Sequence, residues 1–249
     1  MSLDLLAALE HLRLKGVRLI CFGDFRQLPP VSNYWRGQEV QRDVFEHSRL
    51  FHSWAGGRRY VLGRCRRSDQ AHFTFYTTIK DWSLEEALRA ARARHPPRSD
   101  DYDWNLVLSN AKRQQINDRL QRKAAAAHED KLWIEAADVP FDCFVGTKLV
   151  GCNNTHKKIV NGSFLRVTSV SPTSIGLLDE DVGEEQFEVT PEQVAKHTRL
   201  RWALTIYGSQ GRSLPGTIAV HDSHSRFFSL THLYVALSRA TDGANVSVV

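Results

Sequence analysis

Apolar residues recur at helical spacing near each end of the chain. The first stretch spans residues 3–14, and its apolar positions are Leu5, Leu6, Leu9 and Leu12. The second spans residues 229–240, and its apolar positions are Leu230, Leu233, Tyr234 and Leu237. This spacing gathers the apolar side chains on one face, so we expect a helix with a buried face in each stretch. Gly16 follows the first stretch and is typical of a helix end.

Short apolar runs alternate with further helical patterns. The runs predict strands over residues 17–22, 105–109, 202–206, 217–221 and 245–249. Helices are expected between them over residues 83–94 and 111–129, with Ser83 and Glu86 as a capping box. Strands that alternate with helices are typical of an α/β fold. A shorter helix is expected around residues 41–50, and Gly56-Gly57 is the most plausible boundary between two lobes.

The segment 141–199 has a different pattern. Short β-like runs alternate there with turn signals such as Asn161-Gly162 and 179–183. The runs cover residues 148–151, 163–170, 174–178 and 186–190. Such regular spacing predicts a small β-barrel inserted into the second lobe.

Composition sets limits on the class of protein. The 249 residues are 42% hydrophobic, which is enough for packed cores, and the formal net charge is +5. Nothing resembles an export signal or an apolar stretch long enough for a membrane, so we expect a soluble protein that is not secreted. The cysteines fit no zinc pattern, which favours reduced thiols in the cytoplasm or nucleus. They are Cys21, Cys65, Cys143 and Cys152. No metal site is predicted.

Two stretches carry chemistry suited to phosphate. Residues 207–211 form a glycine-flanked turn after a predicted strand, where the backbone can approach an anion closely. Arg239 lies at the end of the last predicted helix, off its apolar face, and could act as a fork for a phosphate group. An ordinary partner of the helix dipole is the alternative for that arginine.

Three motifs in order resemble those of superfamily 1 DNA helicases, most closely the PIF/RecD-like branch. Residues 23–31 read G-D-F-R-Q-L-P-P-V, residues 207–211 read Y-G-S-Q-G, and residues 234–239 read Y-V-A-L-S-R. They resemble motifs III, V and VI of that family. The run Arg64-Cys-Arg-Arg67, followed by Ser68-Asp69, resembles the motif IV arginine and its polar pair.

The resemblance implies RecA-like lobes of the P-loop NTPase type. Residues 1–56 would be the end of the first lobe. Residues 57–140 and 200–249 would form a complete second lobe. Residues 141–199 would be the small β-barrel insert that the family often carries.

The resemblance also implies roles at a nucleotide site. Gln27 would sense the γ-phosphate of ATP, and Asp24 would help to hold the lobe junction. Arg66 and Arg239 would act as arginine fingers, so Gln27, Arg66 and Arg239 are the candidate catalytic residues. The candidate ATP-binding residues are Gly23, Asp24, Gln27, Arg66, Gln210, Gly211 and Arg239.

A DNA contact is implied at nearby positions. The candidate DNA-binding residues are Asn110, Lys112, Thr205, Ser209 and Gln210. Asn110 resembles part of the family's T-N motif, and Gln210 with Gly211 would link the nucleotide to DNA. For Asp24 and Asn110, simple turn chemistry is the alternative.

The sequence departs from the family in two ways. Tyr207-Gly208 stands where the family has His-Lys, which removes a phosphate-directed charge. A G-x-x-x-x-G-K-[ST] phosphate loop and an Asp-Glu magnesium motif are not found. The chain therefore resembles the C-terminal portion of a helicase, beginning just after the magnesium motif.

Three hypotheses remain open. The first is a helicase portion that acts on single-stranded DNA and uses ATP and Mg²⁺ only when a missing N-terminal segment is supplied, by a longer chain or a split partner. On that view the chain alone is inactive. The second is a non-catalytic nucleic-acid-binding remnant, and the third is a portion of a viral-type RNA helicase.

Overall fold

The computed structural model describes residues 3–29, 34–35, 38–40, 44, 46–54, 56, 58–98, 101–183 and 186–249. Pro30, Val31 and Gly57 lie outside the described residues, as does part of the helix predicted over residues 41–50. Helix α3 (Arg49–Trp54) begins near the end of that range.

A four-stranded parallel sheet forms the centre of the molecule. Its strands are β3 (Trp104–Val107), β11 (Ala203–Thr205), β12 (Ile218–Val220) and β13 (Val246–Val248), in the order β11-β3-β12-β13. Asn105 pairs with Ala203 on one side and with Ala219 on the other. The predicted strands at these places are therefore confirmed, with shorter bounds.

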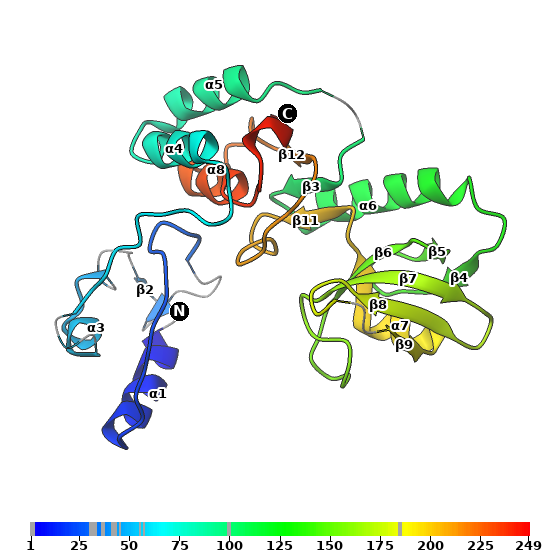
Figure 1. Ribbon diagram of the computed structural model, residues 1–249, viewed down its shortest axis with the longest axis horizontal. Helices are drawn as coiled ribbons and strands as arrows, with labels where there is room; N and C mark the ends of the chain where they lie inside the picture. Colours follow the sequence, from blue (N-terminus) through cyan, green and yellow to red (C-terminus); the bar gives the residue numbers. More distant parts are fainter. Residues whose placement is uncertain are drawn as a thin grey trace.

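Helices cover both faces of this sheet (Figure 1). Helices α4 (Gln70–Ile79), α5 (Leu84–Arg94) and α8 (Leu230–Leu237) share one apolar core with Leu106 and Leu204. Helix α6 (Asn110–Ala125) packs through Ile116 and Leu120 against Val107. Successive strand residues point to opposite faces of a sheet. Leu106 therefore faces the core shared with α4, α5 and α8, whereas its neighbour Val107 faces α6. We call these strands and helices the parallel unit.

Side-chain caps define where the helices start. Ser83 and Glu86 form the predicted capping box of α5. Ser109 caps α6 by accepting a hydrogen bond from the backbone of Lys112, so Asn110 is already the first helical residue. Asp69 caps α4, a helix that the sequence pattern did not predict.

A five-stranded antiparallel sheet lies where the insert is predicted. Its order is β10-β6-β7-β8-β9, and β4 pairs with β5 beside it. Helix α7 (Pro191–His197) adds Val194 to the same core. The strands are β4 (Leu132–Ile134), β5 (Phe141–Cys143), β6 (Lys148–Gly151), β7 (Phe164–Val170), β8 (Ile175–Asp179), β9 (Gln186–Val189) and β10 (Thr198–Leu200). We call residues 132–200 the antiparallel unit.

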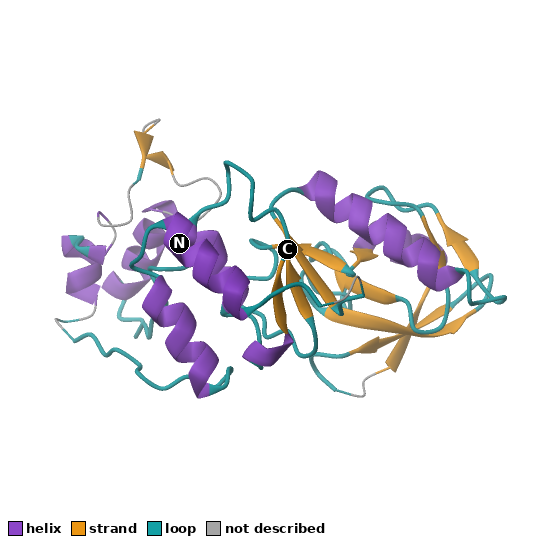
Figure 2. Ribbon diagram, turned by 90° about the horizontal axis from the view of Figure 1, so that it is seen from above, coloured by secondary structure: helices purple, strands orange, loops and turns teal. Residues whose placement is uncertain are grey.

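The two units are joined along α6 and by a stack of side chains. The Arg113 guanidinium forms two hydrogen bonds with the Asp138 carboxylate, at 2.7 and 2.6 Å. The Arg201 guanidinium lies 4.9 Å from the ring centre of Trp104 and 5.0 Å from that of Phe164. Figure 2 shows α6 alongside the strands, whereas most other helices gather at the opposite end.

The N-terminal part extends away from the parallel sheet (Figure 1). It holds α1 (Leu3–Leu14), as predicted, the short pair β1 (Tyr34–Trp35) and β2 (Gln38–Glu39), and α3. The Trp54 indole donates a hydrogen bond to Glu10, which ties α3 to α1.

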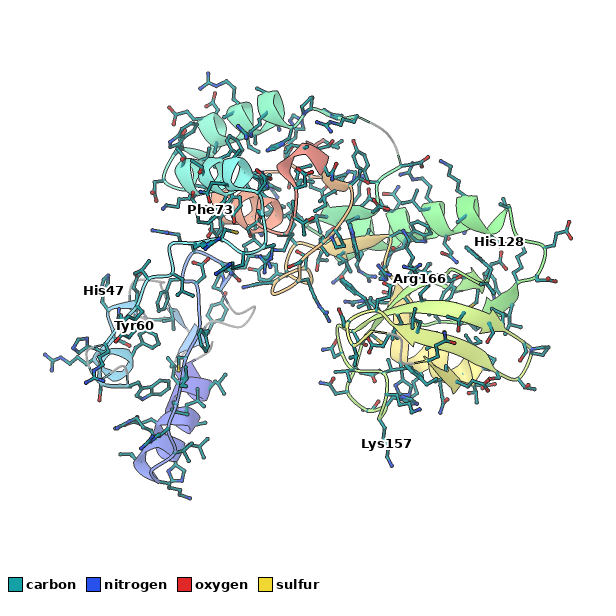
Figure 3. The ribbon with its side chains drawn as sticks, viewed as in Figure 1. His47, Tyr60, Phe73, His128, Lys157 and Arg166 are labelled. Atoms are coloured by element: carbon teal, nitrogen blue, oxygen red, sulfur yellow. The ribbon has the colours of Figure 1, made fainter. Side chains whose placement is uncertain are left out.

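The strand predicted over residues 17–22 is wrong. These residues form no strand, and Ile20 and Phe22 are 82% and 87% exposed. An apolar run becomes a strand only beside a partner, and no described strand pairs with it. Tyr60 is exposed in the same way on the segment between α3 and α4 (Figure 3).

The short 3₁₀ helix η1 (Gly243–Asn245) precedes the last strand, β13, and its Gly243 amide donates to Asp69. Within the described part of the chain, none of the helices has the length and apolar character needed to cross a membrane.

Candidate functional site

Asn110, Lys112, Thr205 and the turn 207–211 lie at one edge of the parallel sheet. Because all four strands are parallel, their carboxyl ends meet at this edge, where ligands of α/β proteins usually bind. Strand β3 leads into Ser109 and Asn110, β11 into the turn 206–211, and β12 into His221. We call this the carboxyl edge.

The turn after β11 is held by its own side chains. Thr205 Oγ1 accepts a hydrogen bond from the Gly208 amide at 3.0 Å. Ser209 is fully buried, and its hydroxyl donates to the Ile206 carbonyl at 2.8 Å. Gly211 adopts a φ of 85°, a left-handed conformation that favours glycine. In this conformation Thr205 and Ser209 shape the turn, and the buried Ser209 hydroxyl is turned away from solvent.

The turn meets the stretch 23–29 through Gln210. The Gln210 side-chain amide donates to Gln27 Oε1 at 3.2 Å and to the Leu28 carbonyl at 3.4 Å. Gln27 and Gln210 lie 183 positions apart in the sequence. Leu28 is buried against the core of the parallel unit, which anchors the contact.

A second contact joins the same stretch to α8. The Tyr234 hydroxyl donates to Asp24 Oδ2 at 3.0 Å. Burial, with the Asp24 carboxylate, raises the pKa of Tyr234 to about 12, so the hydroxyl stays protonated and remains a donor. Gly23 lies exposed beside Asp24. The sequence had placed Tyr234 only in the apolar face of α8, so its polar role was missed.

Arg239 follows the end of α8 and is fully buried. Its Nε donates to the Val235 carbonyl at 3.1 Å, its Nη1 to the Arg212 carbonyl at 3.1 Å and its Nη2 to Ser238 Oγ at 2.8 Å. Burial, with nearby Arg67, lowers the pKa of Arg239 to about 10. All three guanidinium nitrogens thus have protein acceptors in this conformation.

Two neighbouring arginines on the segment before α4 differ in placement. Arg66 is exposed and has no hydrogen-bond or ion-pair partner among the described residues. Arg67 instead donates to Ser213 Oγ and to the Ser238 carbonyl, both at 2.8 Å. Arg67 therefore lies next to Arg239, a position that the motif comparison did not single out.

The start of α6 brings positive charge to the carboxyl edge. Burial lowers the pKa of His221. The adjacent Asp222 carboxylate opposes this shift, and the nearby cations Lys112 and Arg119 add to it. The lowered pKa favours the neutral form of His221, whose ring Nε2 lies 2.9 Å from Asn105 Oδ1. Asn110 Oδ1 accepts from Arg113 Nε at 3.1 Å. The structure thus brings Asn110 and Lys112 to the same sheet edge as Thr205.

The chemistry of this edge suits an anion rather than a cation. Besides the Asp24 and Asp222 carboxylates, which already accept hydrogen bonds from Tyr234 and Leu108, its side chains include amides, hydroxyls, lysine and arginines, which are donors to phosphate oxygens. Among the described residues, no three His, Cys, Asp or Glu side chains converge in a way that could hold a metal ion.

Neither a family profile nor a curated protein matches the chain at the level of sequence. Its structure, however, resembles solved Pif1 helicases. The Pif1 helicase from Candida albicans superposes with a TM-score of 0.62 at 19% identity, covering 91% of this chain and 62% of that one. The Pif1 helicase from Bacteroides in complex with ADP-AlF3 and ssDNA gives 0.60 at 20% identity, with 91% and 61% covered.

A third structure, Bacteroides Pif1 bound to ssDNA, gives a TM-score of 0.51 at 18% identity, with 74% and 50% of the two chains covered. The chain thus spans about three fifths of the length of the two structures that it matches over 91% of its residues. At these identities the likeness concerns the fold. The chain has a mixed α/β fold that matches the RecA-like lobes of Pif1 helicases.

Proposed function

We propose that the chain is a portion of an ATP-dependent DNA helicase that moves along single-stranded DNA and unwinds duplex. The observation that carries this proposal is the contact between Gln27 and Gln210. It joins two distant stretches that both resemble nucleotide-responsive helicase motifs, at the sheet edge where an α/β protein binds ligands. The Bacteroides Pif1 neighbours were solved with ADP-AlF3 and with ssDNA, which supports the same ligand classes here.

The proposed nucleotide site combines residues of both stretches. Gln27 would sense the γ-phosphate, with Gly23 and Asp24 before it and Gln210 and Gly211 across from it. Arg66 has its guanidinium donors free for a phosphate. Arg239 fits that role only after it leaves the acceptors that now hold it.

ATP and Mg²⁺ would bind once a further segment supplies the phosphate loop and the acidic pair. When bound, the nucleotide would supply the phosphoryl group whose transfer drives movement. This chain's residues would position that group and stabilise its charge. On its own, residues 1–249 would not turn over ATP. The segment could belong to the same natural chain or to a split partner.

The proposed DNA track follows the carboxyl edge. Lys112 would pair with a backbone phosphate, Asn110 and Thr205 would contact the backbone nearby, and Ser209 would do so through its main chain. Gln210 would then touch both ligands.

The proposed domain division follows the same scheme. Residues 1–56 would be the end of the first lobe, residues 57–140 with 200–249 the second lobe, and residues 141–199 the insert.

One observation favours the alternative of a non-catalytic nucleic-acid-binding remnant. Arg239 is fully buried and has acceptors for all its nitrogens, as expected of an arginine kept for structure. The two functions differ in ATP turnover by the completed core, whereas both expect DNA binding.

DNA binding is tested with a fluorescent oligo-dT strand and anisotropy titrations of residues 1–249 at several salt concentrations. Single-strand binding should weaken steeply as salt rises, because phosphate contacts release counterions. Lys112→Ala should weaken binding and lower the salt slope by about one.

Lys157→Ala is the matched control. It removes the same charge from an exposed position at the far tip of the antiparallel unit (Figure 3). Equal losses for both variants would mean attraction by overall charge and would contradict a track at the carboxyl edge. Salt-insensitive binding would also contradict it.

A further inference from the structure

Arg212 lies between the antiparallel unit and Arg239. Its Nη1 forms an ion pair with Asp181 Oδ2 at 2.6 Å, and its Nη2 donates to the Gly162 carbonyl. Its guanidinium lies 4.6 Å from the ring centre of Phe164. Asp181, Gly162 and Phe164 all belong to the antiparallel unit, so this unit holds the Arg212 side chain on three sides.

The main chain of Arg212 faces the other way. Its carbonyl accepts the 3.1 Å hydrogen bond from Arg239 Nη1, and two residues later the Leu214 amide donates to the Arg239 carbonyl at 2.9 Å. One residue therefore contacts the antiparallel unit with its side chain and Arg239 with its backbone. We call this arrangement the Arg212 latch.

The latch keeps Arg239 away from solvent. Arg239 is fully buried, and to contact a ligand it must leave the Arg212 carbonyl. That carbonyl moves only with the segment 207–214, which the Arg212 side chain anchors to the antiparallel unit. The fixed fork of an arginine suits this anchoring, because it donates to a carboxylate and a carbonyl together.

We propose that Arg212 is the positioning residue for Arg239, and that the position of the antiparallel unit decides whether Arg239 is held or released. The latch holds Arg239 while the antiparallel unit is docked. A ligand that binds the undocked state more tightly releases it, since ligands shift such equilibria only through differential affinity. The identity of the group that Arg239 then meets rests on the proposed function, whereas the latch itself does not.

The experiment measures hydrogen exchange of the Arg239 Nε–H by NMR in residues 1–249, with Arg239→Lys to assign the signal. No nucleotide or DNA is added, so a failure here is distinct from a failure of the proposed function. Arg212→Ala and Asp181→Ala should each accelerate the exchange about tenfold or more. Arg212→Lys should give an intermediate rate, because lysine keeps the charge but loses the fork.

Arg166→Ala is the matched control. Arg166 forms an ion pair with Glu180 in the same junction without touching Arg212, and it lies between the two units (Figure 3). Its exchange rate should equal that of the wild type. If Arg212→Ala does not fold, Arg212→Lys and Asp181→Ala decide. Unchanged Arg239 exchange in the latch variants, or equal acceleration in Arg166→Ala, would overturn the proposal.

Discussion

His72 and His95 pack against each other inside the parallel unit, with ring centres 5.3 Å apart. Burial lowers the pKa of His72 and brings that of His95 down to about 4, helped by the neighbouring His72. Both rings are therefore neutral in the folded state at pH values where an unfolded histidine takes up a proton.

These pKa values set the acid stability. The unfolded chain binds protons below about pH 6.5, whereas folded His95 does so only near pH 4. The free energy of unfolding should thus fall as pH drops from about 6.5 to 4, by up to about 3 kcal/mol for His95. Urea unfolding across this pH range checks the loss. His95→Gln should flatten the pH dependence, whereas the exposed His52→Gln should not; equal slopes in the wild type and His95→Gln would refute the assignment.

Single residues also show what sequence could reveal about the site. Gln27, Asp24 and Gln210 were predicted from motifs, and the structure brings them together. The partner of Asp24, Tyr234, was missed because a tyrosine at an apolar helical position gives no sign that its hydroxyl is used. Likewise, sequence alone could not show which of the adjacent residues Arg66 and Arg67 would lie beside Arg239.

At the scale of elements, Asp69 joins two parts of the chain. Its carboxylate accepts from the His72 amide at the start of α4 and from the Gly243 amide in η1, each at 2.8 Å. A Cβ on Gly243 would lie 2.7 Å from the His72 side chain, so the two segments pack closely. Asp69 is thus a helix cap and a tertiary contact at once.

Removing Asp69 should cost more than removing a simple cap. We expect Asp69→Ala to lower the free energy of unfolding by about 2–3 kcal/mol, since a cap and a charged hydrogen bond are both lost. Ser83→Ala, which removes only the cap of α5, should cost about 1 kcal/mol. Thermal and urea unfolding of the two variants provide the comparison. Equal losses would show that the Gly243 bond contributes nothing.

Elements were predicted well where one local signal dominated. The capping box fixed the start of α5. Regular apolar runs predicted the four parallel strands and β6 to β9 of the antiparallel sheet, whereas β10 was not predicted. Helix α4 was missed because its aromatic and threonine residues have modest helical propensity, and packing against α8 stabilises it instead. The error at residues 17–22 has the opposite cause. The apolar run that favours a strand is present there, but none of the described strands pairs with it.

At the scale of the whole molecule, the arrangement depends on contacts between distant segments. Residues 23–29 are held by Gln210 and Tyr234, and the antiparallel unit is held by Arg113, Arg201 and Arg212. The likeness to Pif1 helicases covers 91% of the chain. The mixed α/β fold is confirmed on that ground, whereas the domain limits and the roles of the site residues stay predictions.

The central claim is that this chain carries the phosphate-sensing half of a helicase site. The most direct measurement is the ATPase rate, with and without oligo-dT, of residues 1–249 fused behind a segment that carries the phosphate loop and the acidic pair. Residues 1–249 alone should show no turnover, and the fusion should show turnover stimulated by DNA. Arg239→Ala and Arg66→Ala should each reduce the stimulated rate of the fusion by roughly 10³-fold, the scale of an arginine finger, while Lys157→Ala leaves it unchanged. A stimulated rate that survives Arg239→Ala would contradict the account, as would turnover by residues 1–249 alone that disappears in the same variant.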